Sequence, residues 1–206
     1  MPLGSEIPDP GTLQAGRVGI RVVRRGDADI MRTLLVANRR WLEHWEATHP
    51  SGRGVVPGSV SMRPTIRVMR KQLAAGTGIP YVVLYDDVVV GQLSVSEISG
   101  GALQDAQIGY WVSEEVAGRG IVPLAVALAI DHLFFTLGLH RVEICIRPEN
   151  GPSLRVVEKL GLRYEGRRDA YIHIDGAWRD HDCFAITREE IPGGLVHRLN
   201  SPASSA

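Results

Sequence analysis

The sequence predicts an α+β fold (a three-layer α/β arrangement), in which helices flank a mixed, mostly antiparallel sheet with a central parallel strand pair. Turn-forming residues at Asp86-Asp87 and Asp175-Gly176 separate stretches of alternating apolar residues, a pattern typical of antiparallel hairpins. Between residues 108 and 147 a strand, a glycine loop, a long apolar helix and a second strand follow one another. This crossover predicts the parallel pair. A chain of 206 residues suits one domain, expected over residues 17–190.

The two ends of the chain have a different composition from the middle. Residues 1–16 contain three prolines and three glycines and predict a flexible N-terminal arm, and residues 191–206 predict a flexible C-terminal tail. Hydrophobic spacing predicts the elements between them. In order they are a strand around Ile20 and Val22, a helical region from Asp27 to Trp45, a helix over 66–74, two strands joined at Asp86-Asp87, the crossover, a short helix capped by Asn150, and the hairpin around Asp175-Gly176.

The stretch IGYWVSEEVAGRGIV, residues 108–122, contains the first chemical signal. Its alternating apolar residues indicate a strand, and Gly118 and Gly120 permit a left-handed backbone in the loop that follows. Pro123 suits the first turn of the next helix, whose free amides and dipole attract anions. The pattern favours a phosphate-binding loop, with an ordinary strand-to-helix turn as the alternative. It lacks the GK[ST] of a Walker loop and the third glycine of a dinucleotide fingerprint.

Composition excludes several classes of function. Lys plus Arg number 23, as do Asp plus Glu, so no broad positive field for nucleic acid or an anionic membrane is expected. The apolar run at 121–137 is too short to span a membrane, and the sequence contains no charged N-terminus followed by an apolar signal core, which predicts a soluble, cytoplasmic protein. Cys145 and Cys183 are expected to be buried thiols. The seven histidines show no metal-ligand spacing, so no metal is expected.

The order of elements resembles the GCN5-related N-acetyltransferase (GNAT) superfamily, whose acyl-CoA N-acyltransferase fold it implies. It is most similar to the branch of the ribosomal-protein-alanine and serine N-acetyltransferases. Besides residues 108–122, the stretches RPENGPSLRVVEKLGLRYEG and YIHIDGAWRDHDCFAIT carry the resemblance, which covers roughly residues 17–190. It implies acetyl-CoA as co-substrate.

The resemblance also implies cofactor contacts. Family members hold the pyrophosphate on a glycine loop whose three defining positions are Ala117, Gly120 and Val122 here, so only the central glycine is retained. Asn150 would lie near the pantetheine, and Ser153 near the sulfur would be the general acid. The alternative is that Asn150 caps a helix and Ser153 occupies its first turn. The residues implied in cofactor binding are Trp111, Val112, Ala117, Gly118, Arg119, Gly120, Ile121, Val122, Asn150 and Ser153.

Direct attack by an amine on a thioester requires a neutral amine and a proton for the sulfur. Glu97 and Glu114 are the acids nearest the expected carbonyl, and either is a candidate base, although both also suit solvated loops. A protein N-terminus has a pKa of about 7.7 to 8, so a weak or water-mediated base would suffice. Trp41, His44 and Trp45 are candidates for the acceptor wall, with core packing as the alternative for Trp41.

The leading hypothesis is therefore acetyl transfer to the N-terminal α-amine of a protein, such as a ribosomal protein. One alternative is a small-molecule amine acetyltransferase, which for a polycation would need an acidic pocket. The other is a catalytically weak CoA-binding regulatory protein, motivated by Ala117, Val122 and Pro123. Acetyl-CoA and a protein or peptide N-terminus are the expected partners, with no direct nucleic acid and no membrane, in a monomer or homodimer.

Overall fold

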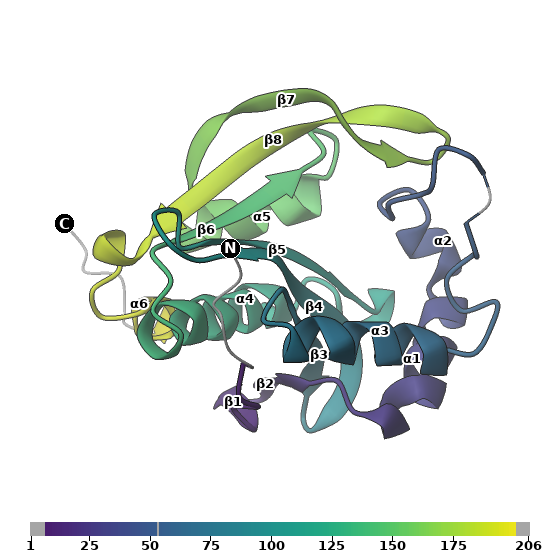
Figure 1. Ribbon diagram of the computed structural model, residues 1–206, viewed down its shortest axis with the longest axis horizontal. Coiled ribbons are helices and arrows are strands. Elements are labelled where there is room, and N and C mark those ends of the chain that lie inside the picture. Colours follow the sequence, from purple (N-terminus) through teal and green to yellow (C-terminus); the bar gives the residue numbers. More distant parts are fainter. Residues whose placement is uncertain (1–6, 53, 201–206) are drawn as a thin grey trace.

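A computed structural model describes residues 7–52 and 54–200, and its centre is one mixed sheet (Figure 1). Within these residues the sheet has eight strands in the order β1-β2-β3-β4-β5-β6-β8-β7. All neighbours are antiparallel except β5 and β6, which form the predicted parallel pair. The strands are β1 (Thr12–Ala15), β2 (Val18–Val22), β3 (Ile79–Tyr85), β4 (Val88–Ser99), β5 (Asp105–Val112), β6 (Arg141–Ile146), β7 (Arg163–Ile174) and β8 (Ala177–Thr187).

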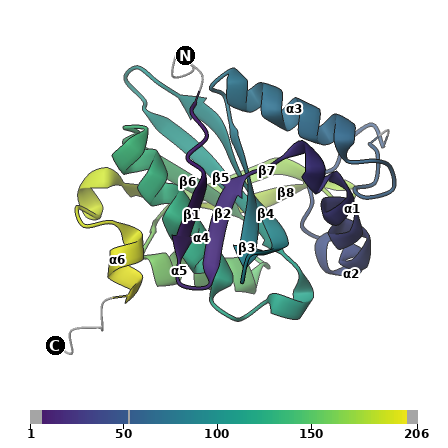
Figure 2. The same cartoon turned by 90° about the horizontal axis from the view of Figure 1, so that it is seen from below.

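Helices cover both faces of the sheet (Figure 2). On one face lie α1 (Ala28–Ala37), α2 (Arg39–Leu42) and α3 (Arg63–Ala74); on the other lie α4 (Ile121–Asp131), α5 (Gly151–Leu160) and α6 (Leu195–Asn200). The structure also contains the short 3₁₀ turns η1 (Arg25–Asp27), η2 (Glu114–Val116) and η4 (Arg188–Glu190), and a π turn, η3 (His132–Thr136), extends α4. No helix of the described residues is long and apolar enough to cross a membrane.

The helix α4 is the centre of the larger core. Apart from Asp131 at its end, it is apolar on all sides, as expected for a buried helix, and Val126 and Ile130 are completely shielded from solvent. Burial of each such side chain contributes about 1.5–3 kcal/mol. The helix therefore holds the loop at its N-terminus in a fixed position.

Both predicted hairpins are present. Asp86 and Asp87 have φ of 50° and 63°, and Asp175 and Gly176 have φ of 49° and 75°. Two successive left-handed residues form the turn that matches the twist of antiparallel strands. These turns connect β3 with β4 and β7 with β8 and set the start of their antiparallel pairing.

The parallel pair separates after three residues. Residues 105–107 pair with residues 141–143, yet β5 continues to Val112 and β6 to Ile146. The two strands therefore diverge, and the opening between them receives the residues of the candidate site.

The chain ends are more ordered than their composition predicted. Thr12–Ala15 form β1 instead of part of a flexible arm, because Gly16 (φ 59°) turns the chain back onto β2. At the other end the expected tail includes α6, whose Leu195 is fully buried and whose first amides bond to the Asp131 carboxylate at 2.7 and 3.0 Å. Residues 1–6 and 201–206 of the predicted arm and tail lie outside the described residues.

The helical region predicted from Asp27 to Trp45 is interrupted at Asn38, where φ −102° and ψ 18° separate α1 from α2. The Asn38 side chain explains the break, because its amide donates to the Leu34 carbonyl and its oxygen accepts from Ser113 Oγ (3.1 Å) and the Glu114 amide (2.8 Å). The Asn38 side chain at this interruption thus anchors the end of β5.

The start of the helix after the glycine loop also differs slightly from the prediction, since α4 begins at Ile121, two residues before Pro123.

Candidate active site

A cavity of about 350 Å³ lies where β5 ends, between the glycine loop, α5 and the tryptophans that follow α1. We call it the cofactor cavity. Many of the residues implicated by the sequence lie in its wall, together with others that were not. Its lining residues are Trp41, Leu42, Trp45, Tyr110, Trp111, Val112, Val116, Ala117, Gly118, Gly120, Ile121, Val122, Pro123, Asn150, Pro152, Ser153, Arg155, Val156 and Lys159.

The glycine loop has the backbone that the sequence predicted. Gly118 and Gly120 have φ of 76° and 75°, and a Cβ at either position would meet nothing within 4 Å. The glycines are therefore favoured by their backbone conformation rather than by crowding. Gly120 is the N-cap of α4, and no side chain of the described residues caps that helix. Its first backbone amides are accordingly free to donate hydrogen bonds to an anionic ligand on the cavity side.

The positive charge of this cavity comes from α5. Arg155 and Lys159, one helical turn apart, both line it, and neither forms an ion pair with a described residue. Arg119, which the resemblance implicated, instead directs its guanidinium to the Glu115 carbonyl at 3.0 Å and does not line the cavity. Two cations beside a helix N-terminus fit a phosphorylated group.

Asn150 and Ser153 lie at the start of α5 and also line the cofactor cavity, so their positions suit both the helix-capping role and the roles in cofactor binding and catalysis considered for them. The Asn150 side chain caps the helix by accepting from the Ser153 amide at 3.2 Å. The half-buried Ser153 has no hydrogen-bond partner for its hydroxyl within residues 7–52 and 54–200. Tyr110 lies beside it and donates to the Ser153 carbonyl at 3.5 Å, and burial raises the pKa of this phenol. Ser153 is thus held in place with its hydroxyl free to donate.

A second cavity of about 200 Å³ lies in the opening between β5 and β6, and we call it the acceptor cavity. It shares Trp45, Tyr110, Asn150 and Ser153 with the cofactor cavity. Its other lining residues are Ala47, Ile108, Gly109, Ile144, Cys145, Ile146, Arg147, Ile172, Ile174 and His181. The two cavities therefore meet at these four residues, one of which is Ser153.

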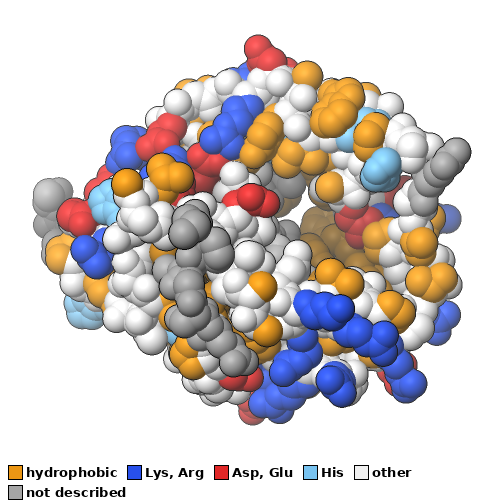
Figure 3. All heavy atoms as spheres, viewed as in Figure 1, with side chains coloured by type: hydrophobic (Ala, Val, Ile, Leu, Met, Phe, Trp, Pro, Cys, Tyr) orange, Lys and Arg blue, Asp and Glu red, His pale blue; other side chains and the backbone are white. Residues whose placement is uncertain are grey.

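Contacts distant in sequence close the outer side of the acceptor cavity. Ala47 forms a bridge with Ile174 at the tip of the β7–β8 hairpin. Next to it, the Thr48 amide donates to the His173 carbonyl at 2.8 Å. Figure 3 shows the molecule hollowed beneath the arch of β7 and β8, beside α2. The hairpin thus acts as a roof that rests on the segment after α2.

The three proposed wall residues have different positions. Trp45 lines both cavities, and the Arg147 guanidinium lies 5.3 Å from its ring. Trp41 lines only the cofactor cavity and donates to the Val112 carbonyl at 3.2 Å. His44 lines neither cavity: its side chain is 60% exposed, and only its carbonyl reaches the site by accepting from Arg147 at 2.7 Å. The structure therefore does not bring the His44 imidazole to the acceptor.

Neither candidate base lies in these cavities. Glu97 has φ of 53° and lines a separate pocket beside α3 with Gln72 and Ser99. Glu114 is exposed in η2, where its amide donates to the Asn38 side chain and its carbonyl accepts from the Ala117 amide. Both acids follow strand ends in the sequence, but the irregular end of β4 and the turn after β5 leave them outside the lining of both cavities.

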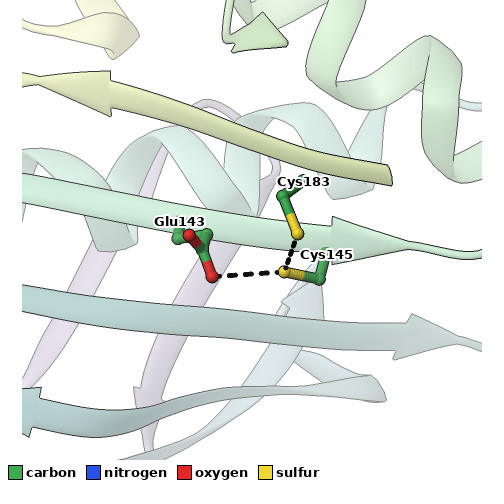
Figure 4. A group of neighbouring side chains, drawn as sticks. All are labelled: Glu143, Cys145 and Cys183. Carbon is green, nitrogen blue, oxygen red and sulfur yellow. Dashed lines mark hydrogen bonds between the residues drawn. The ribbon is translucent and has the colours of Figure 1, made fainter. Parts of the chain in front are cut away.

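Two thiols and a carboxylate lie together on β6 and β8 (Figure 4). Cys145 and Cys183 occupy paired positions with sulfurs 2.9 Å apart, and Cys145 Sγ lies 3.2 Å from Glu143. Burial raises the pKa of Cys145. Although burial also opposes ionisation of Glu143, hydrogen bonds from Cys145, Arg141 and Arg168 hold the pKa of its carboxyl below the ordinary value. Since two guanidiniums already balance this carboxylate, the cluster favours protonated thiols over a metal site.

Sequence reasoning missed several residues of the two cavities. The spacing of Arg155 and Lys159 on one helix face was a usable signal for a phosphate site. Tyr110 was interpreted only as part of a strand pattern. Arg147 and His181 carry no local motif, and they reach the acceptor cavity from the end of β6 and from β8. Only the pairing of distant strands places them there.

Comparisons with known proteins identify the family of this chain. The Acetyltransferase (GNAT) domain family matches residues 17–163. The structure of Mycobacterium smegmatis RimJ in complex with CoA-disulfide is similar, with a TM-score of 0.84 and 36% identity over 96% of this chain and 95% of that one. The [Ribosomal protein uS5]-alanine N-acetyltransferase of Escherichia coli (strain K12) is 28% identical, over 85% and 90% of the two chains. The "Probable N-acetyltransferase YjcK" of Bacillus subtilis (strain 168) is 43% identical over 101 residues, which span 49% of this chain and 56% of that protein.

Proposed function

The chain belongs to the GNAT acetyltransferase family, and from this premise we propose that it transfers the acetyl group of acetyl-CoA to the N-terminal α-amine of a protein. Acetyl-CoA is the donor that GNAT acetyltransferases use. The observation that carries the proposal is the junction of two cavities at Ser153, one with the features of a phosphate site and the other closed by the β7–β8 hairpin. Donor and acceptor would enter from opposite sides.

The cofactor cavity fits coenzyme A despite the departures of the glycine loop. Ala117 changes little, because backbone amides bind phosphate whatever the side chain. Val122 lines the cavity, and Pro123 offers no amide, so the number of backbone donors is reduced. Arg155 and Lys159 supply the compensating positive charge. These features favour an enzyme that binds acetyl-CoA over one that has lost the site.

The reaction forms one bond and breaks another, and it requires two proton transfers. The neutral amine attacks the thioester carbonyl, the C–N bond forms, and the C–S bond breaks. Ser153, whose hydroxyl is free at the junction of the cavities, would donate a proton to the departing sulfur. Asn150 and Tyr110 would hold Ser153 in place through its amide and carbonyl. Reactants held in this way react without the entropy loss of a free encounter.

The chemistry of the acceptor cavity favours an N-terminus over a polyamine. No Asp or Glu is among its lining residues within the described chain, and the charged residue that lines it is Arg147. A polycation would lack partners and would meet a like charge. An uncharged α-amine on a peptide does not have this difficulty, and its pKa of about 7.7 to 8 leaves a neutral fraction at pH 7. The similarity to a uS5-alanine N-acetyltransferase supports the same class of acceptor.

Thiol release from acetyl-CoA over a panel of acceptors tests the proposal. Peptides with free N-terminal alanine or serine should support turnover, whereas the same peptides with blocked N-termini and an internal lysine should not. Spermidine serves as the polyamine control. Turnover with spermidine or internal lysine alone would replace the proposed acceptor class, and tight CoA binding with no turnover on any amine would indicate a regulatory protein.

A further inference from the structure

We infer that His181 is the base that takes the proton from the attacking amine. The inference rests on the proposed acetyl transfer and supplies the base that neither Glu97 nor Glu114 provides. His181 belongs to β8, far in sequence from the glycine loop, yet it lines the acceptor cavity with Ser153 and Tyr110. Its side chain would touch the acceptor, not the cofactor.

The hydrogen bond of the imidazole fixes which nitrogen can act. Nδ1 lies 3.0 Å from the Arg179 carbonyl oxygen, which only accepts hydrogen bonds. Nδ1 therefore carries the hydrogen, and the neutral ring presents the lone pair of Nε2. Nε2 has no partner within residues 7–52 and 54–200. The Tyr171 ring meets the imidazole edge-on, with centroids 5.7 Å apart, and limits its rotation.

The surroundings keep the imidazole neutral and ready to accept a proton. His181 is 3% exposed, and this burial lowers its pKa below the ordinary value. The hydrogen bond to the Arg179 carbonyl opposes this shift. Arg147, after β6, lowers the pKa further, and Glu149 and Asp180 raise it. Arg168 on β7, opposite His181 in the register, and Cys145 on β6, in the same cavity, also lie on the neighbouring strands. At neutral pH the ring is uncharged.

The remaining groups of the acceptor cavity are poorer bases. Arg147 is a cation, burial holds Cys145 in the thiol form, and burial likewise holds Tyr110 in the phenol form. An imidazole accepts a proton near neutral pH, which suits an amine that is already partly neutral. His181 thus combines position and protonation state.

The proton balance closes with Ser153. As the C–N bond forms, the amine proton moves to Nε2 of His181; as the C–S bond breaks, the Ser153 proton moves to sulfur. The imidazolium then returns its proton to the serine oxygen, and both residues regain their starting states. The net result is an acetylated amine and the free thiol of coenzyme A.

Chemical rescue of His181→Ala tests this role. Turnover on the peptide that wild type uses should fall about 10²-fold or more, while calorimetry shows an unchanged affinity for coenzyme A. Added imidazole should restore part of the rate, rising with pH as free imidazole loses its proton. His181→Phe, which leaves no space for imidazole, should not be rescued. The matched control is His132→Ala, since His132 is also buried but lies in η3, outside both cavities, and this variant should keep wild-type turnover.

The outcomes separate the two proposals. If wild type acetylates no peptide N-terminus, the proposed function fails, whatever the variants do. If wild type is active and His181→Ala keeps its turnover, or loses it without rescue while binding coenzyme A normally, His181 is not the base. Should the variants not fold, ¹⁵N NMR of wild type decides: a neutral ring with hydrogen on Nδ1 at pH 7 is expected, and a charged ring or hydrogen on Nε2 overturns the inference.

Discussion

The cofactor cavity and the acceptor cavity share four residues but are constructed in different ways. Much of the cofactor cavity comes from one continuous stretch, residues 110–123, and from the first turns of α5. The acceptor cavity combines the segment after α2, both strands of the parallel pair and the distant β7–β8 hairpin. Phosphate binding at a helix start depends largely on backbone amides, whereas the acceptor cavity depends on side chains brought together by the fold. Substitutions should therefore separate cofactor affinity from acceptor turnover.

Ser153→Ala should have the largest effect, because Ser153 belongs to both cavities. Turnover should fall about 10²-fold or more, whereas the dissociation constant of coenzyme A changes by less than about twofold. The variant keeps the amide that bonds to Asn150, so the helix cap persists. Steady-state kinetics and calorimetry measure the two quantities. Ser99→Ala, in the separate pocket beside α3, is the control, and equal losses in turnover and affinity would make Ser153 a structural residue.

Loss of the α5 cations should affect only the cofactor side. Arg155→Ala and Lys159→Ala should each weaken coenzyme A binding about tenfold at low salt, because each removes a charge-assisted contact to phosphate. The difference from wild type should shrink as salt is added. Lys71→Ala, an exposed lysine on α3, should leave the affinity unchanged. An effect of all three substitutions would indicate a diffuse charge effect rather than a site.

Trp45→Ala should mainly affect the acceptor side. The indole supports Arg147 and contributes to the junction of the cavities, so its loss should raise KM for the peptide about three- to tenfold, with a smaller change in coenzyme A affinity. Trp178→Ala removes an exposed tryptophan outside both cavities and serves as the control. A larger loss of cofactor affinity than of peptide affinity would move Trp45 to the cofactor side.

The smallest effect concerns stability. Burial lowers the pKa of His132 and His181, so above about pH 6.5 both folded and unfolded states hold these rings neutral and the stabilisation is complete. As the pH falls below that value, the unfolded chain takes up protons first, and the free energy of unfolding decreases. Thermal unfolding should show this loss, and His132→Leu should reduce it. If His132→Leu loses as much unfolding free energy in acid as wild type does, groups other than His132 cause the effect.

Much of the fold was predictable from local signals. The two hairpin turns, the largely apolar helix α4 and the helix cap at Asn150 follow from rules that act over a few residues, and all are present. The ends of the chain were not predictable in this way. The strand β1, at the edge of the sheet, has only four residues, too few for a clear alternating pattern, and α6 is held by the Asp131 carboxylate, which is 64 residues away from Leu195.

The candidate site shows the same limit. Gly118, Gly120, Asn150 and Ser153 were identified because motif spacing and backbone preference mark them, and the structure places all four in the cofactor cavity. Glu97, Glu114 and His44 were selected because they follow strand or helix ends in the sequence. Where a side chain at the end of an element points depends on bulges and turns that spacing does not encode.

By itself, the sequence determined the alternation of strands and helices, the left-handed glycines before α4 and the short helix that presents Ser153, because each depends on the backbone preferences of neighbouring residues. The tertiary structure alone decided that β5 and β6 separate after three pairs, that the β7–β8 hairpin closes over Ala47, and that His181 enters the same cavity as Ser153. These features arise from strand pairing and packing between residues far apart in the chain, for which no local pattern of residues is required.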